Sequence, residues 1–173
     1  MPTTTPDQSA TPISRLVSVQ RSDLVSLART IAAAHSLDSA LVCAICEQES
    51  SWNPWAIRYE PAFFARYIAP MVAAGKSATP KLSPTEAHAR AFSWGLMQVM
   101  GQVAREQNFT GASCAELCDP STGLEFGCRV LSIKLRAAQG DIARALQLWN
   151  GGANANYAAE VLSRRNSYVT RGS

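Results

Sequence analysis

Apolar residues recur at helical spacing along most of the chain, and this pattern predicts a mainly α-helical protein. The first stripe predicts a helix that Ser22 caps and that ends near His35. Its apolar positions have the i, i+3, i+4, i+7 spacing of an amphipathic helix and are Leu24, Leu27, Ala28 and Ile31.

A second stripe predicts a helix capped by Asp38 and stopped by Asn53 and Pro54. Glu49 falls on the apolar face of this helix, whose other stripe positions are Leu41, Val42, Ile45, Cys46 and Trp52. A carboxyl group therefore lies among residues that we expect to be buried.

The next part of the chain predicts shorter elements. We expect a helix over 61–74 that is interrupted at Pro70, and a loop over 75–80. Ser83 and Glu86 have the spacing of a capping box, so another helix should start there. Residues 96–107, after Gly95, also have helical character.

The last third of the chain predicts three more helices. A long helix should begin at Pro120, behind Asp119, and end at Gly140. A helix over 141–149 should break at Gly151 and Gly152, and a final helix should cover 157–165.

Strand alternation and hairpin turns are scarce in this pattern. We therefore predict one mainly α-helical domain of about seven helices over residues 21–170, without internal repeats. Residues 1–20 should form a flexible tail, because their Thr, Pro and Ser come without an apolar run.

Composition and charge narrow the classes of function. With 173 residues, 47% of them apolar, the chain can bury the core of a single domain. The formal charge of +3 comes without the clustered Lys/Arg stripe of nucleic-acid binders, so we expect no nucleic-acid partner. The chain has no secretory signal and no run of roughly 18 apolar residues, which predicts synthesis in the cytoplasm without stable membrane insertion.

The five cysteines are an odd number, which favours free thiols over a disulfide framework. Cys43 and Cys46 form a C-x-x-C pair, which also occurs in redox motifs and zinc sites. The pair lies inside an apolar helix, however, and neither His35 nor His88 has the spacing of a ligand. We expect buried structural cysteines, and no metal or organic cofactor is implied.

Glu49 is the strongest candidate for chemistry. Burial disfavours the charged form of a carboxyl group, and a raised pKa would suit it to act as a general acid near neutral pH. The alternative is structural: Glu49 could turn outward at the helix end or pair with a nearby Arg.

Three segments in order indicate a family. They are Glu49-Ser50-Ser51-Trp52-Asn53-Pro54, Gly95-Leu96-Met97-Gln98-Val99-Met100 and Leu148-Trp149-Asn150-Gly151-Gly152. Together they resemble the soluble lytic transglycosylases, which have a Glu-Ser pair before an Asn-Pro turn, a Gly-Leu-Met-Gln segment and a later Tyr-Asn-Ala-Gly segment. The resemblance covers residues 41–161.

The resemblance implies a lysozyme-like α-helical domain with a saccharide groove and Glu49 as its single catalytic acid/base. Glu49 would protonate the glycosidic oxygen between N-acetylmuramic acid and N-acetylglucosamine. The ionised group would then take a proton from the muramoyl 6-hydroxyl, which yields a 1,6-anhydro product. Such a mechanism needs no second carboxylate, whereas many glycosidases use two.

The resemblance also implies residues that bind the substrate. Ser50 belongs to the Glu-Ser pair, Gln98 would form hydrogen bonds with the sugar, and Met100 would contact it or pack in the core. Asn150 matches the asparagine of the later segment. Trp149 replaces the tyrosine of that segment and removes a hydroxyl, although its indole could stack on a sugar.

Two other residues could complete the site. Tyr157 could supply the missing hydroxyl or simply pack in the core. Glu60 could hold Glu49 or activate a water, although an ion pair with Arg58 is the simpler expectation.

The stretch between Trp55 and Trp94 is longer than the usual spacing and should form a wall of the cleft. Its Arg58-Tyr59-Glu60-Pro61 run resembles phage and prophage members of the family. We therefore expect a monomeric phage endolysin or virion-associated lysin that acts on peptidoglycan strands in the periplasm or cell wall, with holins or a phage tail as delivery partners. The alternatives are a lysozyme-type muramidase and an inactive wall-binding or structural module.

Overall fold

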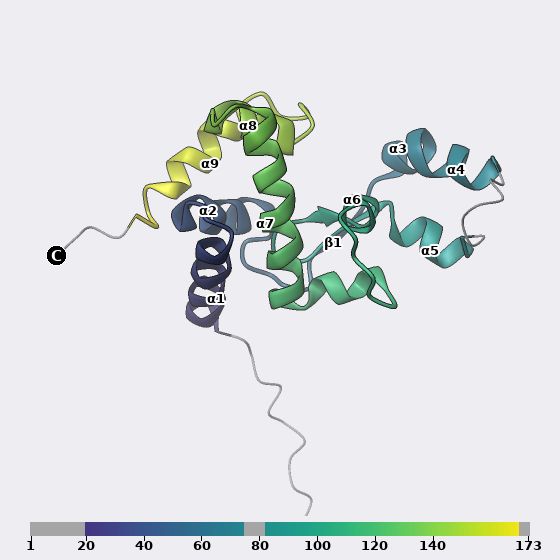
Figure 1. The fold of residues 1–173 in the computed structure, drawn as a ribbon, viewed down its shortest axis with the longest axis horizontal. Helices are drawn as coiled ribbons and strands as arrows, with labels where there is room; N and C mark the ends of the chain where they lie inside the picture. The colour runs from purple at the N-terminus through teal and green to yellow at the C-terminus, as the bar shows by residue number, and fades with distance from the viewer. Residues whose placement is uncertain (1–19, 75–81, 170–173) are drawn as a thin grey trace, which may run out of the picture.

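The computed structural model describes residues 20–74 and 82–169. The tail predicted for residues 1–20, apart from Gln20, and the loop predicted for 75–80 lie outside the described residues. The described part is mainly α-helical, so the predicted fold class is confirmed (Figure 1).

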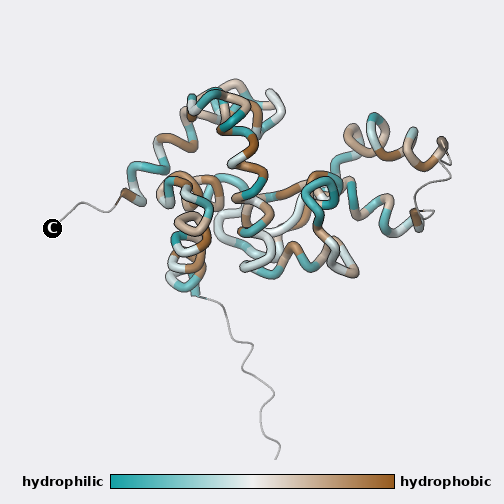
Figure 2. The backbone as a smooth tube through the Cα atoms, viewed as in Figure 1, coloured by the Kyte–Doolittle hydropathy of each residue, from teal (hydrophilic) through white to brown (hydrophobic). Residues whose placement is uncertain are grey.

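Five helices form the main body. They are α1 (Arg21–Ala34), α2 (Ser39–Ser50), α7 (Pro120–Ala137), α8 (Ile142–Trp149) and α9 (Tyr157–Arg165). The centre of this body is α2, which packs against α1 and α9, while α7 packs against α1 and α8. Every residue of α2 from Ala40 to Cys46 is buried. Hydrophobic and hydrophilic residues alternate along the turns of α1 and α7, as the predicted stripes require (Figure 2).

The helix starts are partly as predicted. Asp38 caps α2 by accepting hydrogen bonds from the backbone of Ala40 and Leu41, and Asp119 precedes α7, as predicted, and caps it. Asp141 caps α8, which therefore begins one residue later than the helix predicted over 141–149. Ser22 was the wrong choice for α1, because the helix already begins at Arg21, behind Gln20. A serine inside the first turn is too far along to accept from the second and third helical amides.

The second helix ends earlier than its apolar stripe. The last residue of α2 is Ser50, and Ser51 and Trp52 follow with φ angles of 51° and 66°. These left-handed conformations end the helix before the Asn53-Pro54 pair. Trp52 is nevertheless buried, so its place in the apolar stripe reflects core packing in the turn.

A small antiparallel sheet was not expected from the sequence. It comprises β1 (Ile57–Tyr59), β2 (Phe92–Trp94) and β3 (Val99–Met100), in that order. The helix predicted over 96–107 is therefore shorter and is α6 (Gly101–Glu106). Gly95 and Gln98 have φ angles of 70° and 49°, and such left-handed residues make a turn instead of a helix.

The segment between β1 and β2 forms an arm that extends from the main body (Figure 1). It comprises α3 (Pro61–Phe63), a π-helical turn (Phe64–Ile68), α4 (Ala69–Ala73) and α5 (Pro84–Ala89). The predicted interruption of the helix occurs just before Pro70, where the helix widens into a π turn. The backbone amide of Ala69 closes this turn by donating to the carbonyl of Phe64. A wider turn relieves the clash between a proline ring and the preceding turn.

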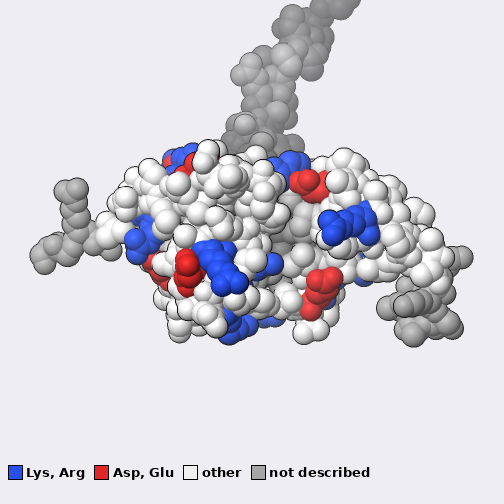
Figure 3. Space-filling model, turned by 90° about the horizontal axis from the view of Figure 1, so that it is seen from above, with Lys and Arg blue, Asp and Glu red and all other residues white. Residues whose placement is uncertain are grey.

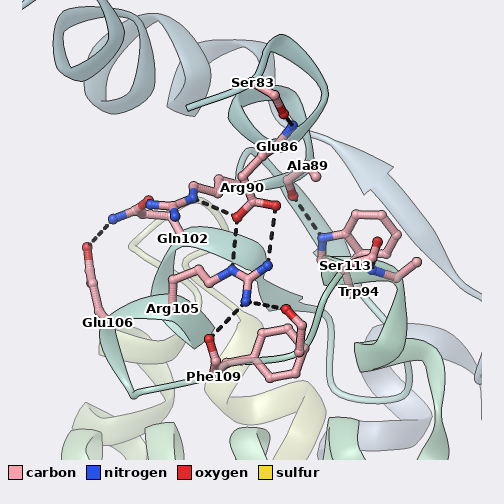
Figure 4. Close-up of polar contacts among 12 residues, drawn as sticks. Ser83, Glu86, Ala89, Arg90, Trp94, Gln102, Arg105, Glu106, Phe109 and Ser113 are labelled. Atoms are coloured by element: carbon pink, nitrogen blue, oxygen red, sulfur yellow. Dashed lines mark hydrogen bonds and ion pairs between the residues drawn. The ribbon is translucent and has the colours of Figure 1, made fainter. Parts of the chain in front are cut away.

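Glu86 connects the arm to α6 (Figure 4). One oxygen of Glu86 accepts hydrogen bonds of 2.9 Å from both Arg90 and Arg105. Arg105 also donates to the carbonyls of Phe109 and Gly111. Burial alone would raise the pKa of Glu86, but the hydrogen bonds from Arg105 and Arg90 outweigh it and lower the pKa.

The capping box predicted at the start of α5 is only half formed. The Ser83 side chain accepts from the backbone of Glu86, at 3.1 Å. The Glu86 carboxylate turns to the two arginines instead of the Ser83 backbone, because a charged partner offers a stronger hydrogen bond.

The five cysteines are free and buried, as predicted. Cys114 and Cys118 are the first and last residues of a short 3₁₀ helix. Burial raises the pKa of the Cys43 thiol to about 11. These thiols are therefore protonated and pack as small apolar groups.

None of the helices in residues 20–74 and 82–169 combines the length and apolarity that a membrane crossing requires. On the face in Figure 3, basic and acidic side chains lie interspersed, so this face presents no continuous band of one charge.

Candidate active site

Glu49 lies in the last turn of α2, half-buried, where two side chains from distant parts of the chain reach it. Trp149, the last residue of α8, donates its indole N–H to Glu49 Oε1 over 3.0 Å. Tyr157, the first residue of α9, donates its hydroxyl to the same oxygen over 2.5 Å. The structure thus brings together three of the residues predicted for the site.

The second oxygen of Glu49, Oε2, has no hydrogen-bond partner among the described residues. In the described part of the chain, every fully buried side-chain nitrogen or oxygen has a hydrogen-bond partner. Oε2 has no such partner, so it is not fully buried. Oε2 is therefore the oxygen of Glu49 that is exposed to solvent.

Burial raises the pKa of Glu49, although hydrogen bonds from Tyr157 and Trp149 and the charge of Arg58 lower it in part. The net effect is an upward shift, which favours the protonated acid at higher pH than for an exposed glutamate. Burial and the neighbouring Glu49 in turn raise the pKa of Tyr157, so its hydroxyl stays a donor.

A loop joins the two donors, and Glu160 holds it in place. Glu160 accepts a 2.8 Å hydrogen bond from Gln48, the residue next to Glu49 on α2. It also accepts from the side chain of Asn154, in the loop, with both distances at 3.3 Å. The Asn154 carbonyl accepts from Asn150 over 3.2 Å, so the predicted Asn150 supports the loop.

Sequence reasoning missed Glu160. It lies three residues after Tyr157, so both face the same side of α9, and this spacing could have indicated a shared role. Gln48 was missed as well, because its side chain leaves the apolar stripe.

Ser50 and Gln98 hold the turn after β2 in place next to the end of α2. Ser50 donates to the carbonyl of Leu96 over 2.9 Å, which ties the end of α2 to the turn after β2. Gln98 donates to the carbonyls of Ala56 and Gly95, both at 2.9 Å, and accepts from Ser93. In this structure both side chains hold the turn together.

Met100 lies in β3 and is partly buried. This position allows the apolar contact expected of it.

Gly95 lets this turn lie close to the 3₁₀ helix. A Cβ atom at this position would lie 2.3 Å from the carbonyl oxygen of Leu117, closer than real contacts allow. The glycine is therefore required both by the left-handed backbone and by the neighbouring carbonyl.

Glu60 pairs with Arg58, at 2.6 Å, and shares no hydrogen bond with Glu49 in the described part of the chain. Arg58, by contrast, is close enough for its charge to act on Glu49. The charged group from β1 that influences the acid is thus a cation.

An open pocket of about 420 Å³ lies elsewhere, between α5 and β2. It contains none of the predicted site residues and is lined by Pro84, Thr85, His88, Ala89, Phe92 and Trp94.

Comparison with known proteins identifies the family. The sequence model described as the transglycosylase SLT domain matches residues 26–168. No curated protein and no solved structure matched the chain. The family match spans most of the chain and includes all three motif segments, with Glu49, Gln98 and Asn150 among its residues. The chain belongs to the transglycosylase SLT domain family, and its helical architecture is that of a lysozyme-like SLT domain.

Proposed function

We propose that the protein is a peptidoglycan lytic transglycosylase with Glu49 as its single acid/base. Family membership supports lytic transglycosylase activity on peptidoglycan in general. The observation that carries the catalytic assignment is the arrangement around Glu49, in which Oε1 accepts from Trp149 and Tyr157 while Oε2 is open.

The two oxygens would have different tasks. The raised pKa keeps a proton on the carboxyl group, and Oε2 donates it to the glycosidic oxygen between the muramoyl and glucosaminyl rings. As the proton leaves, negative charge develops on the carboxylate. Trp149 and Tyr157 stabilise this charge because their donors already point at Oε1.

In the second step the same carboxylate acts as a base. Once the bond from muramoyl C1 to the glycosidic oxygen has broken and the glucosaminyl residue has left with the donated proton on its 4-hydroxyl, the carboxylate takes the proton of the muramoyl 6-hydroxyl. The oxygen of that hydroxyl bonds to C1 of the same ring and gives the 1,6-anhydro end. The acid is thereby restored, and the bonds formed and broken balance without added water.

The neighbouring carboxylates support a mechanism with one acid. Among the described residues, Glu160 accepts from Gln48 and Asn154, and Glu60 is paired with Arg58 through one of its oxygens. A two-carboxylate glycosidase needs a second free carboxylate across the bond that is cleaved.

The remaining predicted residues would bind the substrate. We assign sugar contacts to Ser50, Gln98 and Met100 and to the loop that contains Asn150. The described part of the arm, residues 61–74 and 82–89, would form one wall of the cleft.

The test compares two carboxyl-to-amide variants on purified sacculi. Glu49→Gln keeps the shape but cannot donate a proton, so turnover should fall by about 10³-fold or more. Glu60→Gln is the matched control and should keep measurable activity. Circular dichroism should show both variants folded; normal turnover by a folded Glu49→Gln variant would reject the assignment.

We also propose a phage or prophage origin, with the enzyme acting on the cell wall as an endolysin or a virion-associated lysin. Support comes from the Arg58-Tyr59-Glu60-Pro61 run and the aromatic residues after it. Adjacent holin genes would support the endolysin role and adjacent tail genes the virion role, whereas bacterial secretion or conjugation genes would reject both.

A further inference from the structure

We propose that Arg58 binds a carboxylate of the stem peptide carried by the muramoyl residue, and so selects glycan strands with charged stems. This inference rests on the proposed function. It assigns a substrate contact to a residue that neither the motif segments nor the family match single out.

The register of the sheet determines which way Arg58 faces. The carbonyl of Ala56 accepts from Gly95, and the amide of Glu60 donates to Ala91. Arg58 is paired with Ser93 between these two hydrogen bonds. Because side chains alternate along a strand, Arg58 and Glu60 share the face on which Ser93 contacts Gln98.

The other face of β1 carries a different set of side chains. Tyr59 lies there beside Phe92, with ring centroids 5.0 Å apart, and Ile57 is paired with Trp94. The strand thus separates an aromatic face, next to the open pocket, from the face that carries Arg58. Arg58 lies on the side of the sheet where Ser93 contacts Gln98, and the turn that contains Gln98 is tied to the end of α2, because the carbonyl of Leu96 accepts a hydrogen bond from Ser50.

The guanidinium of Arg58 is available for a second partner. Its side chain is 68% exposed, and Glu60 accepts only from Nε. The two terminal nitrogens have no partner among the described residues. A carboxylate can therefore approach them in the bidentate geometry that arginine favours, while Glu60 fixes the orientation of the guanidinium.

Charge identifies the matching part of the substrate. The sugar rings of peptidoglycan are neutral, and the lactyl group of intact strands is consumed in an amide bond. Free carboxylates first occur on the stem peptide, which is attached to the muramoyl ring whose glycosidic oxygen Glu49 would protonate. Arg58 is paired with Ser93, whose side chain contacts Gln98, and its charge acts on Glu49, so the proposal places the stem of that ring within reach of Arg58.

The test uses one glycan preparation in two forms. In one form the stems keep their carboxylates; in the other the same carboxylates are converted to primary amides. The wild-type kcat/KM should be about fivefold higher on the carboxylate form, the size expected for one exposed charge-assisted hydrogen bond. The difference should appear in KM, because this contact is the same in the bound and transition states.

Variants at Arg58 separate charge from shape. Arg58→Gln should bring the ratio of the two kcat/KM values close to one. Arg58→Lys should keep an intermediate preference, because lysine restores the charge without the bidentate geometry.

Arg129→Gln is the matched control. Arg129 also pairs with a glutamate, Glu125, at 2.7 Å, and is partly exposed. Glu125 contacts His35, just before α2, whereas Glu49 lies at the far end of that helix, about 15 Å away. This variant should keep the wild-type ratio.

Equal wild-type activity on the two forms, or an unchanged preference in Arg58→Gln, would overturn the role of Arg58 while leaving the proposed function intact. Absence of glycan cleavage by the wild type on both forms would overturn the proposed function, and this inference with it.

Discussion

Tyr157 donates its hydroxyl to Oε1 of Glu49 over 2.5 Å, although the two residues lie 108 positions apart in the chain. The family segment has a tyrosine where this chain has Trp149, and the substitution removes a hydroxyl. The structure shows that the indole N–H of Trp149 reaches Glu49 and that Tyr157 brings a hydroxyl to the same oxygen. The substitution at position 149 therefore preserves a donor to Glu49.

Tyr157→Phe should alter both the rate and its pH dependence. The hydrogen bond from Tyr157 lowers the pKa of Glu49, so its loss should raise that pKa further. Glu49 must start protonated, and the basic limb of the kcat/KM profile should move to higher pH. The maximal rate should fall by about tenfold, because one hydrogen bond to the developing carboxylate is lost.

Tyr59→Phe is the control for this experiment, since the ring of Tyr59 lies against Phe64, His88 and Phe92 and, in the described part of the chain, its hydroxyl donates no hydrogen bond to Glu49. Its profile should match the wild type. A basic limb that moves to lower pH in Tyr157→Phe would contradict the geometry around Glu49.

Gly95→Ala should destabilise the protein by more than about 2 kcal/mol, because a Cβ atom would collide with the carbonyl of Leu117. Gly140→Ala is the matched control: Gly140 also has a positive φ, of 86°, but nothing lies within 4 Å of its Cβ position. Thermal unfolding measures both. Equal losses would mean that the left-handed backbone alone, and not the collision, determines the cost.

Glu86→Gln should lower the melting temperature by about 5 °C at neutral pH, because it weakens the contacts from Arg90 and Arg105 to the arm. The pKa of Glu86 is lowered from its ordinary value of 4.5. The stabilisation is therefore complete above that pH and is lost as pH falls through the lower pKa. The difference in melting temperature between wild type and variant should shrink as the pH falls. A difference that grew would reject the ion-pair account.

The sequence was sufficient for the parts of the fold that repeat a helical period. The apolar stripe that carries Glu49 and the cap at Asp38 were both predictable, because each depends on neighbours within one helix. The β1–β2–β3 sheet was not predictable, since strands of two or three residues are too short to show alternation.

The candidate site was predictable only where a motif marks it. Glu49 combined a motif with an apolar stripe, but the contact of Glu160 with Gln48 and the pairing of Arg58 with Ser93 join segments that are distant in the sequence. Glu60 illustrates the limit: its position after the Asn53-Pro54 turn suggested a role beside Glu49, whereas its nearest opposite charge is Arg58, two residues away. Local ion pairs of this kind form at little entropic cost.

The most direct test of the central claim is mass spectrometry of the muropeptides that the wild-type enzyme releases from purified sacculi. The tethered 6-hydroxyl has a high effective concentration at the reacting carbon, and in the described part of the chain the carboxylates of Glu160 and Glu60 are already engaged with Gln48 and Arg58. The account predicts 1,6-anhydromuramoyl ends, which are one water lighter than reducing ends. Reducing ends alone would contradict it and would identify the enzyme as a lysozyme-type hydrolase.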